Sequence, residues 1–254
     1  MHKKIHDKAP GIIVLAAGKG TRMNSDIPKV LHLIHGKTMI SCVLECAASI
    51  TDEKNIVVVV GHQSEKVKEE VKKKFKVLFA LQKNLSGTGD AVKSGLPFLM
   101  HTIENIIILC GDVPLIKPET LIKLADYHEM NMNDLTVLAV ELSDPSGYGR
   151  LILDSDGSLL CIREESDATH EEKQINIINS GVYCVRRKFL SQSLDLISRN
   201  NAQKEYYLTD IVFVAKEKGA KAGYIVADDP AEFKGVNTLQ ELKNLEKLIP
   251  GLDL

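Results

Sequence analysis

Short β-branched runs alternate with segments of helical spacing in the first half of the chain, and this alternation constrains the fold more than any other feature. Three runs are continuously apolar, as strands covered on both faces are: residues 12–15, 56–60 and 106–109. Apolar residues recur at helical spacing over residues 39–50 and again, in a lysine-rich segment, over residues 67–75. Strand–helix–strand units of this kind build a largely parallel sheet with right-handed crossovers. We therefore expect an α/β fold.

The second half of the chain is less regular. The Asp154–Gly157 segment has the composition of a hairpin turn, which predicts an antiparallel insertion around residues 141–185. Residues 239–248 predict a final amphipathic helix, which Pro250 and Gly251 should end. The other strand-like segments of this half are residues 135–142, 150–153, 159–162, 182–185 and 224–226.

Composition limits the classes of partner. The net charge is −2, so the chain lacks the broad basic field of a non-specific nucleic-acid binder, and we expect no nucleic-acid partner. Five cysteines without a C-x-x-C pair argue against a disulfide framework or zinc site and for a reducing compartment. The start has no apolar signal segment, and no apolar run is long enough to span a bilayer. We expect a cytoplasmic protein without a membrane partner.

The loop after the first strand has the features of a phosphate-binding loop. Gly18 and Gly20 let backbone N–H groups approach anionic oxygens, and this loop follows the carboxyl end of a strand, where ligands of open α/β sheets bind. Lys19, Arg22 and Lys29 bring positive charge to the same place. A glycine pair alone would indicate only a strand-to-helix turn, but the ordered basic residues favour function.

Two common glycine motifs are excluded. The Walker pattern requires Lys-Ser or Lys-Thr after its second glycine, whereas Gly18-Lys19 is followed by Gly20. The dinucleotide fingerprint requires a third glycine where Met23 stands, and the next strand ends in Gly61-His62 without the acidic residue that would bind a ribose.

The sequence L-A-A-G-x-G-T-R-M followed by P-K resembles the signature of sugar-phosphate nucleotidyltransferases, and most resembles the uridylyltransferase half of bifunctional N-acetylglucosamine-1-phosphate uridyltransferases. Further blocks keep that family's order, at residues 82–89, 111–115, 147–150, 164, 178–181, 201–210 and 235–237. The resemblance implies a Rossmann-like three-layer fold of the nucleotide-diphospho-sugar transferase type. It also implies one domain over residues 1–254, with a nucleotide part at about 10–135, a sugar part at about 136–237 and a C-terminal helix at about 238–249.

The resemblance assigns catalytic roles to Arg22 and Lys29, which would hold the triphosphate. Gln82 can pair with a donor and an acceptor on a pyrimidine. Thr88 precedes a helix and, by itself, could equally be a helix cap. The nucleotide-binding residues implied are Leu15, Ala16, Ala17, Gly18, Lys29, Gln82, Gly87, Thr88 and Asp112.

The resemblance also implies a Mg²⁺ site formed by Asp112 and Asn237. A carboxylate at the end of a central strand is a good ligand for a hard cation, with the remaining ligands from phosphate and water. By itself Asp112 could be a helix cap or turn residue. One departure is Cys110, where relatives often have tyrosine.

The implied sugar-binding residues are polar groups or small residues suited to hydroxyls and an N-acetyl group. Taken singly, the charged run around Glu164 would be solvated surface and the segment around Asn179 a turn. Tyr207 could pack in the core and Thr209 could cap a helix. The sugar-binding residues carried over are Gly149, Glu164, Asn179, Tyr207 and Thr209.

The implied reaction joins UTP and N-acetylglucosamine 1-phosphate, with release of pyrophosphate, by a single in-line displacement that needs no protein nucleophile. Alternatives remain open: another sugar 1-phosphate, such as glucose 1-phosphate or N-acetylmuramic acid 1-phosphate, another nucleotide, or an inactive nucleotide-sugar sensor. The family's second half is an acetyltransferase β-helix of hexapeptide repeats. No such repeats follow Leu239, so we expect no acetyl transfer. The oligomeric state is left open.

Overall fold

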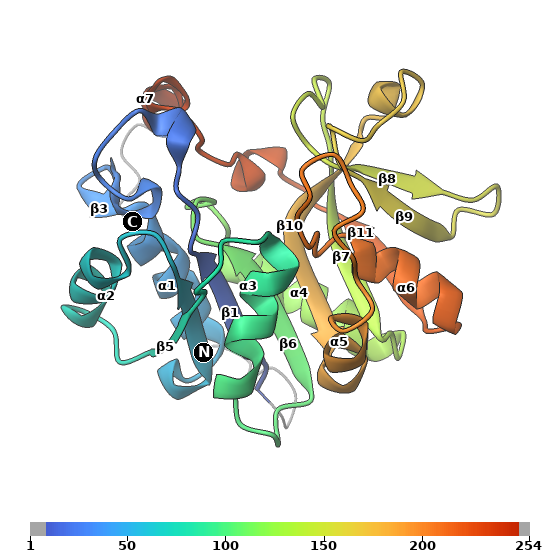
Figure 1. Ribbon diagram of the computed structural model, residues 1–254, viewed down its shortest axis with the longest axis horizontal. Coiled ribbons are helices and arrows are strands. Elements are labelled where there is room, and N and C mark those ends of the chain that lie inside the picture. Colours follow the sequence, from blue (N-terminus) through green and yellow to red (C-terminus); the bar gives the residue numbers. More distant parts are fainter. Residues whose placement is uncertain (1–8, 249–254) are drawn as a thin grey trace.

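The protein, described here from a computed structural model over residues 9–248, is built around one twisted sheet with the strand order β11-β7-β10-β6-β1-β4-β5 (Figure 1). Pro250 and Gly251, expected to end the last helix, lie outside the described residues. The strands of this sheet are β1 (Gly11–Ala16), β4 (Ile56–Val60), β5 (Leu78–Leu81), β6 (Asn105–Cys110), β7 (Leu135–Glu141), β10 (Ile177–Arg186) and β11 (Ala222–Val226).

The sheet is mostly parallel, as expected. β1 pairs in parallel with β4 and β6, β5 continues the parallel order on β4, and β11 is parallel to β7. β10 runs antiparallel between β6 and β7. The antiparallel hairpin of β8 (Arg150–Leu153) and β9 (Leu159–Arg163) joins β10 through the pair Arg150 and Ile178, and the Asp154–Gly157 turn connects its strands. The predicted antiparallel insertion is therefore present.

Helices cover both faces of the sheet, which gives the expected three layers (Figure 1). Ile12 and Val14 of β1 pack into one buried cluster with α1, α2 and α4, whereas Ile13 packs into the other with α3, α5 and α6. This alternation follows from the two-residue period of a strand. The helices are α1 (Met39–Ile50), α2 (Ser64–Lys72), α3 (Thr88–Gly95), α4 (Pro118–Met130), α5 (Arg187–Ser193), α6 (Asp210–Lys218) and α7 (Leu239–Leu248).

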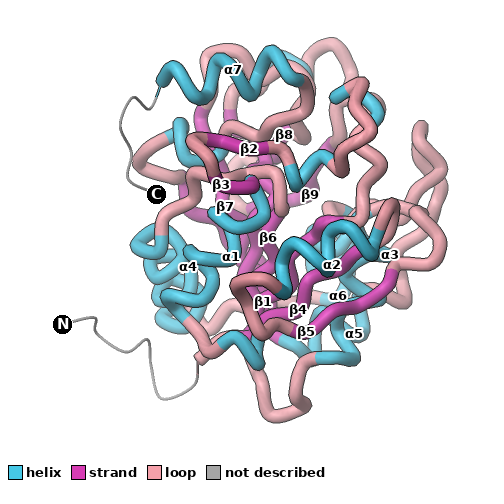
Figure 2. Tube along the Cα trace, turned by 90° about the vertical axis from the view of Figure 1, so that its left-hand side faces the viewer, coloured by secondary structure: helices cyan, strands magenta, loops and turns pink. Residues whose placement is uncertain are grey.

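A third apolar cluster forms under α7, which lies across the top of the molecule above the small hairpin β2 (Leu33–Ile34) and β3 (Lys37–Thr38) (Figure 2). Leu242 and Leu245 are buried there against Met23 and Val236. The apolar face of the predicted amphipathic helix is therefore buried at these two leucines, whereas Leu239 at its first position is 42% exposed.

The structure differs from the sequence expectation in two other places. α4, α5 and α6 were not predicted; in α6 the β-branched residues Ile211, Val212 and Val214 favour a strand by local preference. β10 begins five residues before the expected segment at Val182, and the Asn179–Gly181 segment is a bulged part of the strand rather than a free turn.

The state of the cysteines and the character of the helices bear on disulfide bonds and membrane-spanning segments. All five cysteines are free thiols. No helix within residues 9–248 combines the length and apolar character needed to cross a bilayer.

His128 gives the fold a testable pH dependence. Its imidazole is fully buried on α4, with Nδ1 2.9 Å from Thr136 Oγ1, and burial lowers its pKa from 6.5 to about 4. The folded state therefore keeps His128 neutral, while the unfolded chain takes up a proton below pH 6.5. The free energy of unfolding should fall by about 3 kcal/mol from this group as the pH drops from 6.5 to 4.

Urea unfolding of the wild type and of His128→Gln between pH 7 and pH 4 measures this effect. The variant, which cannot titrate at this position, should lose less stability over the range than the wild type. His170→Gln, at an exposed histidine, is the control and should follow the wild type. Parallel curves for the wild type and His128→Gln would contradict the assignment.

Candidate active site

A cavity of about 500 Å³ opens at the carboxyl ends of β1, β5 and β6, where the order of the parallel strands places a ligand site. It contains every residue that the sequence predicted for nucleotide binding. It also contains Lys19, Leu85, Ala91 and Glu205, which were not assigned. The predicted residues in its wall are Leu15, Ala16, Ala17, Gly18, Lys29, Gln82, Gly87, Thr88 and Asp112.

The loop after β1 is shaped by close contact with Lys29. Gly20 has φ +61°, and a Cβ placed on it would lie 2.7 Å from Lys29 Cβ. Glycine is therefore required there both by the backbone conformation and by the approach of Lys29. The short 3-10 helix Thr21–Met23 follows, with Arg22 exposed and Met23 buried.

Lys29 joins the two predicted metal ligands. Its Nζ forms an ion pair with Asp112 Oδ2 and donates to Asn237 Oδ1 over 3.1 Å. Arg22 Nη2 donates to the same Asn237 oxygen over 2.9 Å. The backbone brings these residues together as well, because Val236 N donates to Asp112 O over 3.1 Å. Asp112 caps no helix in this arrangement, which removes one alternative from the sequence analysis.

The donor set fits a hard divalent cation. Asp112 Oδ2 and Asn237 Oδ1 are a carboxylate and an amide oxygen, the ligand types that Mg²⁺ prefers. Both accept from one ammonium group, so the structure already places a positive charge between them. No group of three His, Cys, Asp or Glu side chains between residues 9 and 248 could hold a metal. A cation here would need further ligands from substrate phosphate and water.

The far end of the cavity is built around the buried side chain of Gln82. Gln82 Nε2 donates to Gly87 O over 3.0 Å and to Asp90 Oδ2 over 2.7 Å. Both partners only accept, so they fix which end of the amide is nitrogen. Neither bond uses Oε1, and Gln82 therefore presents an acceptor in this orientation.

The loop before α6 packs against Gly87 and Thr88. A Cβ on Gly87 would lie 2.5 Å from Tyr206 O, and Gly89 N donates to that oxygen over 2.8 Å. Thr88 is the first residue of α3 rather than its cap, and its Oγ1 accepts from Leu208 N over 3.0 Å. The glycine is thus required by backbone packing, and the threonine hydroxyl ties the two loops together.

Four of the five predicted sugar residues form one group beside this cavity. Asn179 N donates to Gly149 O over 2.8 Å, and a Cβ on Gly149 would lie 3.4 Å from Glu164 Oε2. Thr209 Oγ1 donates to Glu164 Oε1 over 2.9 Å and makes no cap bond to α6. Asn179 Nδ2 donates to the hydroxyl of buried Tyr183 over 2.7 Å.

Glu164 is an unusual carboxylate because within residues 9–248 it is bonded to the Thr209 hydroxyl and not paired with a cation. Burial raises its pKa, and the negative charges of Asp210 and Asp167 raise it further, against the lowering effect of the Thr209 bond. The expectation that this charged run is plain solvated surface does not hold for Glu164, which is half-buried.

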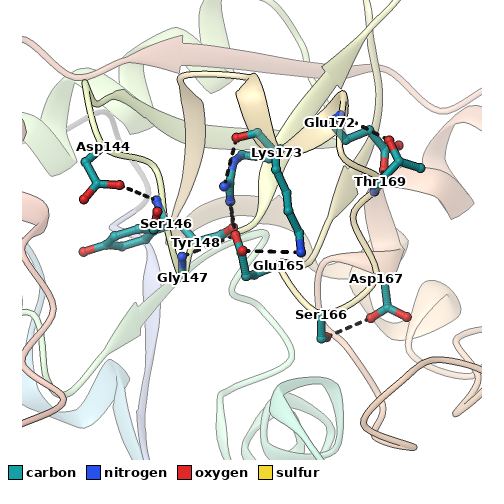
Figure 3. A network of polar contacts seen from close by, with 11 residues as sticks. Asp144, Ser146, Gly147, Tyr148, Glu165, Ser166, Asp167, Thr169, Glu172 and Lys173 are labelled. Carbon is teal, nitrogen blue, oxygen red and sulfur yellow. Dashed lines mark hydrogen bonds and ion pairs between the residues drawn. The ribbon is translucent and has the colours of Figure 1, made fainter.

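Tyr207 lies apart from this group. Its side chain is buried, and its hydroxyl donates to Asp167 Oδ2 over 3.2 Å. Figure 3 shows the neighbouring network, in which Glu165 lies between the Gly147–Tyr148 turn and Lys173. Arg150 is buried and pairs with Glu165 over 2.8 Å, which ties the turn before β8 to the segment that carries Glu164.

Cys110 and Tyr183 lie between the predicted sugar residues and the predicted nucleotide residues. Cys110 lines the cavity, and its Sγ lies 3.7 Å from Gly181 O. Burial raises its pKa to about 12, so it is a neutral thiol at physiological pH. Burial and then Glu164 raise the pKa of Tyr183 well above its ordinary value. Only the unusual residue type at Cys110 gave a sequence signal; Tyr183 looked like a core residue of its strand.

Residues 11–231 match the profile of the nucleotidyl transferase family. The chain belongs to this family. A curated relative named bifunctional protein GlmU, from Clostridioides difficile, is 43% identical over 237 residues, which cover 93% of this chain and 51% of that protein. One of the same name from Desulfotalea psychrophila is 42% identical over 253 residues, which cover 96% of this chain and 74% of that protein.

The chain spans about half the length of several of the curated GlmU relatives it matches. Solved structures agree with the fold. A UDP-glucose pyrophosphorylase complexed with UDP-glucose aligns with a TM-score of 0.73 over 94% of this chain and 97% of that one, at 17% identity. At that identity the likeness shows the nucleotidyltransferase fold alone.

Gly20 provides a direct test of the loop geometry. Gly20→Ala should lower the free energy of unfolding by about 2 kcal/mol, because alanine is strained at a positive φ and its Cβ would press on Lys29. Gly18→Ala is the matched control, since nothing lies within 4 Å of its added Cβ. Urea unfolding of both variants without ligand measures the difference, and equal midpoints would show that the contact is wrong.

Proposed function

We propose that this chain transfers a uridylyl group from UTP to N-acetylglucosamine 1-phosphate, giving UDP-N-acetylglucosamine and pyrophosphate. The observation that carries the proposal is the contact of Lys29 and Asp112, which both line the cavity, with each other and of Lys29 with Asn237. The nucleotide residues lie in the wall of that cavity, and the Gly149–Glu164–Asn179 group lies beside it. Nucleotide and sugar phosphate would therefore meet at this cluster.

The chain's own residues would act by positioning and charge. A phosphate oxygen of the sugar 1-phosphate attacks the α-phosphorus of UTP, and pyrophosphate leaves on the opposite side. Lys29 and Arg22 bring cationic donors to the reacting phosphates, where added negative charge develops in the transition state. Gly18 and the loop around it offer backbone N–H groups to the triphosphate. No protein nucleophile is required.

Asp112 and Asn237 would hold Mg²⁺, which supplies neutralisation of the phosphate charge when bound. In the structure both oxygens accept from Lys29. Lys29 would then exchange these partners for phosphate oxygens when substrate is present. Its ion pair with Asp112 keeps the ammonium group close to the phosphates until that exchange.

Gln82 supports uracil as the base. With Nε2 held by Gly87 O and Asp90, its Oε1 can accept from the N3–H of uracil. Cytosine has an acceptor at N3, which would face that oxygen unfavourably. Thymine has the same pairing edge as uracil, so this contact selects the class of base. Selection of ribose over deoxyribose would depend on other residues.

Glu164 and Asn179 support a sugar with an acetamido group. Glu164 can accept from sugar hydroxyls, and Asn179 offers both a donor and an acceptor beyond its bonds to Tyr183 and Gly181. A site built for such a group penalises a substrate that leaves it unpaired. Tyr207 would support this site from behind rather than contact the sugar, because its hydroxyl is directed to Asp167.

Two alternatives are tested together. Another sugar 1-phosphate or nucleotide would use the same cluster, and the solved relative bound to UDP-glucose represents that class. A catalytically inactive sensor would not need Lys29, Asp112 and Asn237 in contact, which the structure has.

A pyrophosphate-release assay over a matrix of substrates decides between these functions. UTP, CTP, dTTP, ATP and GTP would each be paired with N-acetylglucosamine 1-phosphate, glucose 1-phosphate and N-acetylmuramic acid 1-phosphate. We expect the highest kcat/KM for UTP with N-acetylglucosamine 1-phosphate, about 10-fold or more above glucose 1-phosphate. Equal values for the sugars would contradict the sugar assignment, and no release from any pair would support a sensor.

The metal site makes a separate prediction. Asp112→Ala should reduce kcat by about 100-fold or more, because the cation that would neutralise the phosphate charge loses its carboxylate ligand. Asp195→Ala is the control, since Asp195 is exposed and pairs with the exposed Lys93. Pyrophosphate release by the wild type that persists in excess chelator would exclude a metal role.

Glu164 predicts the pH dependence of sugar binding. Its raised pKa means that the carboxylate, which accepts from the sugar, is present above that pKa and is lost as the pH falls through it. KM for the sugar 1-phosphate should therefore rise on the acid side, and Glu164→Gln should flatten this rise. Titration of the substrate's phosphate affects both proteins equally, so the difference between them is the measurement. Identical pH profiles would remove Glu164 from the sugar site.

A further inference from the structure

The segment of residues 236–238, which carries the proposed metal ligand Asn237, is anchored through three consecutive backbone N–H groups. Val236 N donates to Asp112 O over 3.1 Å. This anchor joins the segment directly to the other proposed metal ligand.

The remaining two anchors come from α7. Glu241 Oε2 accepts from Asn237 N over 2.6 Å and from Thr238 N over 3.1 Å. Thr238 Oγ1 accepts from Glu241 N over 3.1 Å, which completes a reciprocal capping box at the start of α7. A capping box needs only the bonds between Thr238 and Glu241. The shorter bond to Asn237 is additional, and it fixes the peptide of the residue whose side chain meets Lys29.

α7 also packs against the two segments that carry Arg22 and Asn237. Leu242 and Leu245 share a buried cluster with Met23, which follows Arg22, and with Val236, which precedes Asn237. Arg22 and Asn237 are themselves hydrogen-bonded over 2.9 Å. The helix thus supports the two partners of one active-site contact from the same side, although it forms no part of the cavity wall.

We propose that Glu241 is a positioning residue of the active site: its carboxylate holds the Asn237 backbone so that Asn237 Oδ1 faces Asp112 and Lys29. This proposal rests on the proposed function only for its kinetic consequence. The placement of the Asn237 oxygen beside the Asp112 oxygen can be tested by metal binding alone.

The competing explanation is that Glu241 merely starts the helix. The chain offers a matched control, because Thr238→Ala removes the hydroxyl that accepts from Glu241 N but leaves the Glu241–Asn237 bond. Both Thr238→Ala and Glu241→Ala weaken the same cap. Glu241→Ala alone releases Asn237 N. Glu241→Gln retains an acceptor oxygen for that N–H and should rescue the defect.

The test is binding of Mn²⁺, used as the probe for the divalent site, to the full chain with UTP present, followed by electron paramagnetic resonance. Thermal unfolding of each variant is measured in parallel. We expect Glu241→Ala to weaken Mn²⁺ binding by about 10-fold, the lower end of the effect of groups that orient metal ligands. Thr238→Ala should leave Mn²⁺ affinity within about 2-fold of the wild type despite a similar fall in Tm, and Glu241→Gln should bind as the wild type does.

Kinetics give a second readout. In Glu241→Ala the Mg²⁺ concentration for half-maximal rate should rise, while KM for the sugar 1-phosphate stays unchanged. Equal loss of Mn²⁺ affinity in Thr238→Ala and Glu241→Ala, or no loss in either, would overturn the positioning role. If the wild type transfers no uridylyl group, the proposed function fails, whereas the Mn²⁺ comparison still decides the role of Glu241.

Discussion

The ammonium group of Lys29 is the contact on which the geometry of this site depends. It lies between an oxygen of Asp112 at the end of β6 and an oxygen of Asn237 before α7, and so connects parts of the chain that are more than a hundred residues apart. Lys29 reaches that point because Gly20 lacks a side chain where the two segments touch. The two oxygen acceptors that this cation holds are of the ligand types that the proposed divalent ion would need.

Other residues that line the cavity are also held by bonds to residues outside it. The loop at Tyr206–Leu208 holds Gly87 and Thr88 through backbone groups, and Arg150 ties the turn before β8 to the segment of Glu164. Few of these supporting groups face the cavity. Residues outside the cavity therefore bond to the backbone of those that line it, which is the kind of support that a site acting by positioning needs.

Much of this could be predicted from the sequence, for physical reasons that also explain the failures. Continuous apolar runs such as Ile56–Val60 have one explanation, a buried parallel strand, and the structure has it. α6 was missed because its β-branched residues form a helix only through packing on the sheet. The residues of the cavity were found from motifs in order along the chain. Contacts such as Tyr183 with Asn179, or Glu241 with Asn237, depend on side-chain direction, which residue type alone does not give.

We propose that Asp112 and Asn237 form a cation site, whose oxygens Lys29 yields to a metal ion when nucleotide binds. A crystal structure of the chain with Mn²⁺ and a non-hydrolysable UTP analogue, with the metal located by anomalous scattering, tests it most directly. The account predicts one Mn²⁺ bound by Asp112 and Asn237 Oδ1, with Lys29 Nζ moved from Asp112 to a phosphate oxygen. A metal bound elsewhere, or Lys29 still paired with Asp112 beside a bound nucleotide, would contradict it.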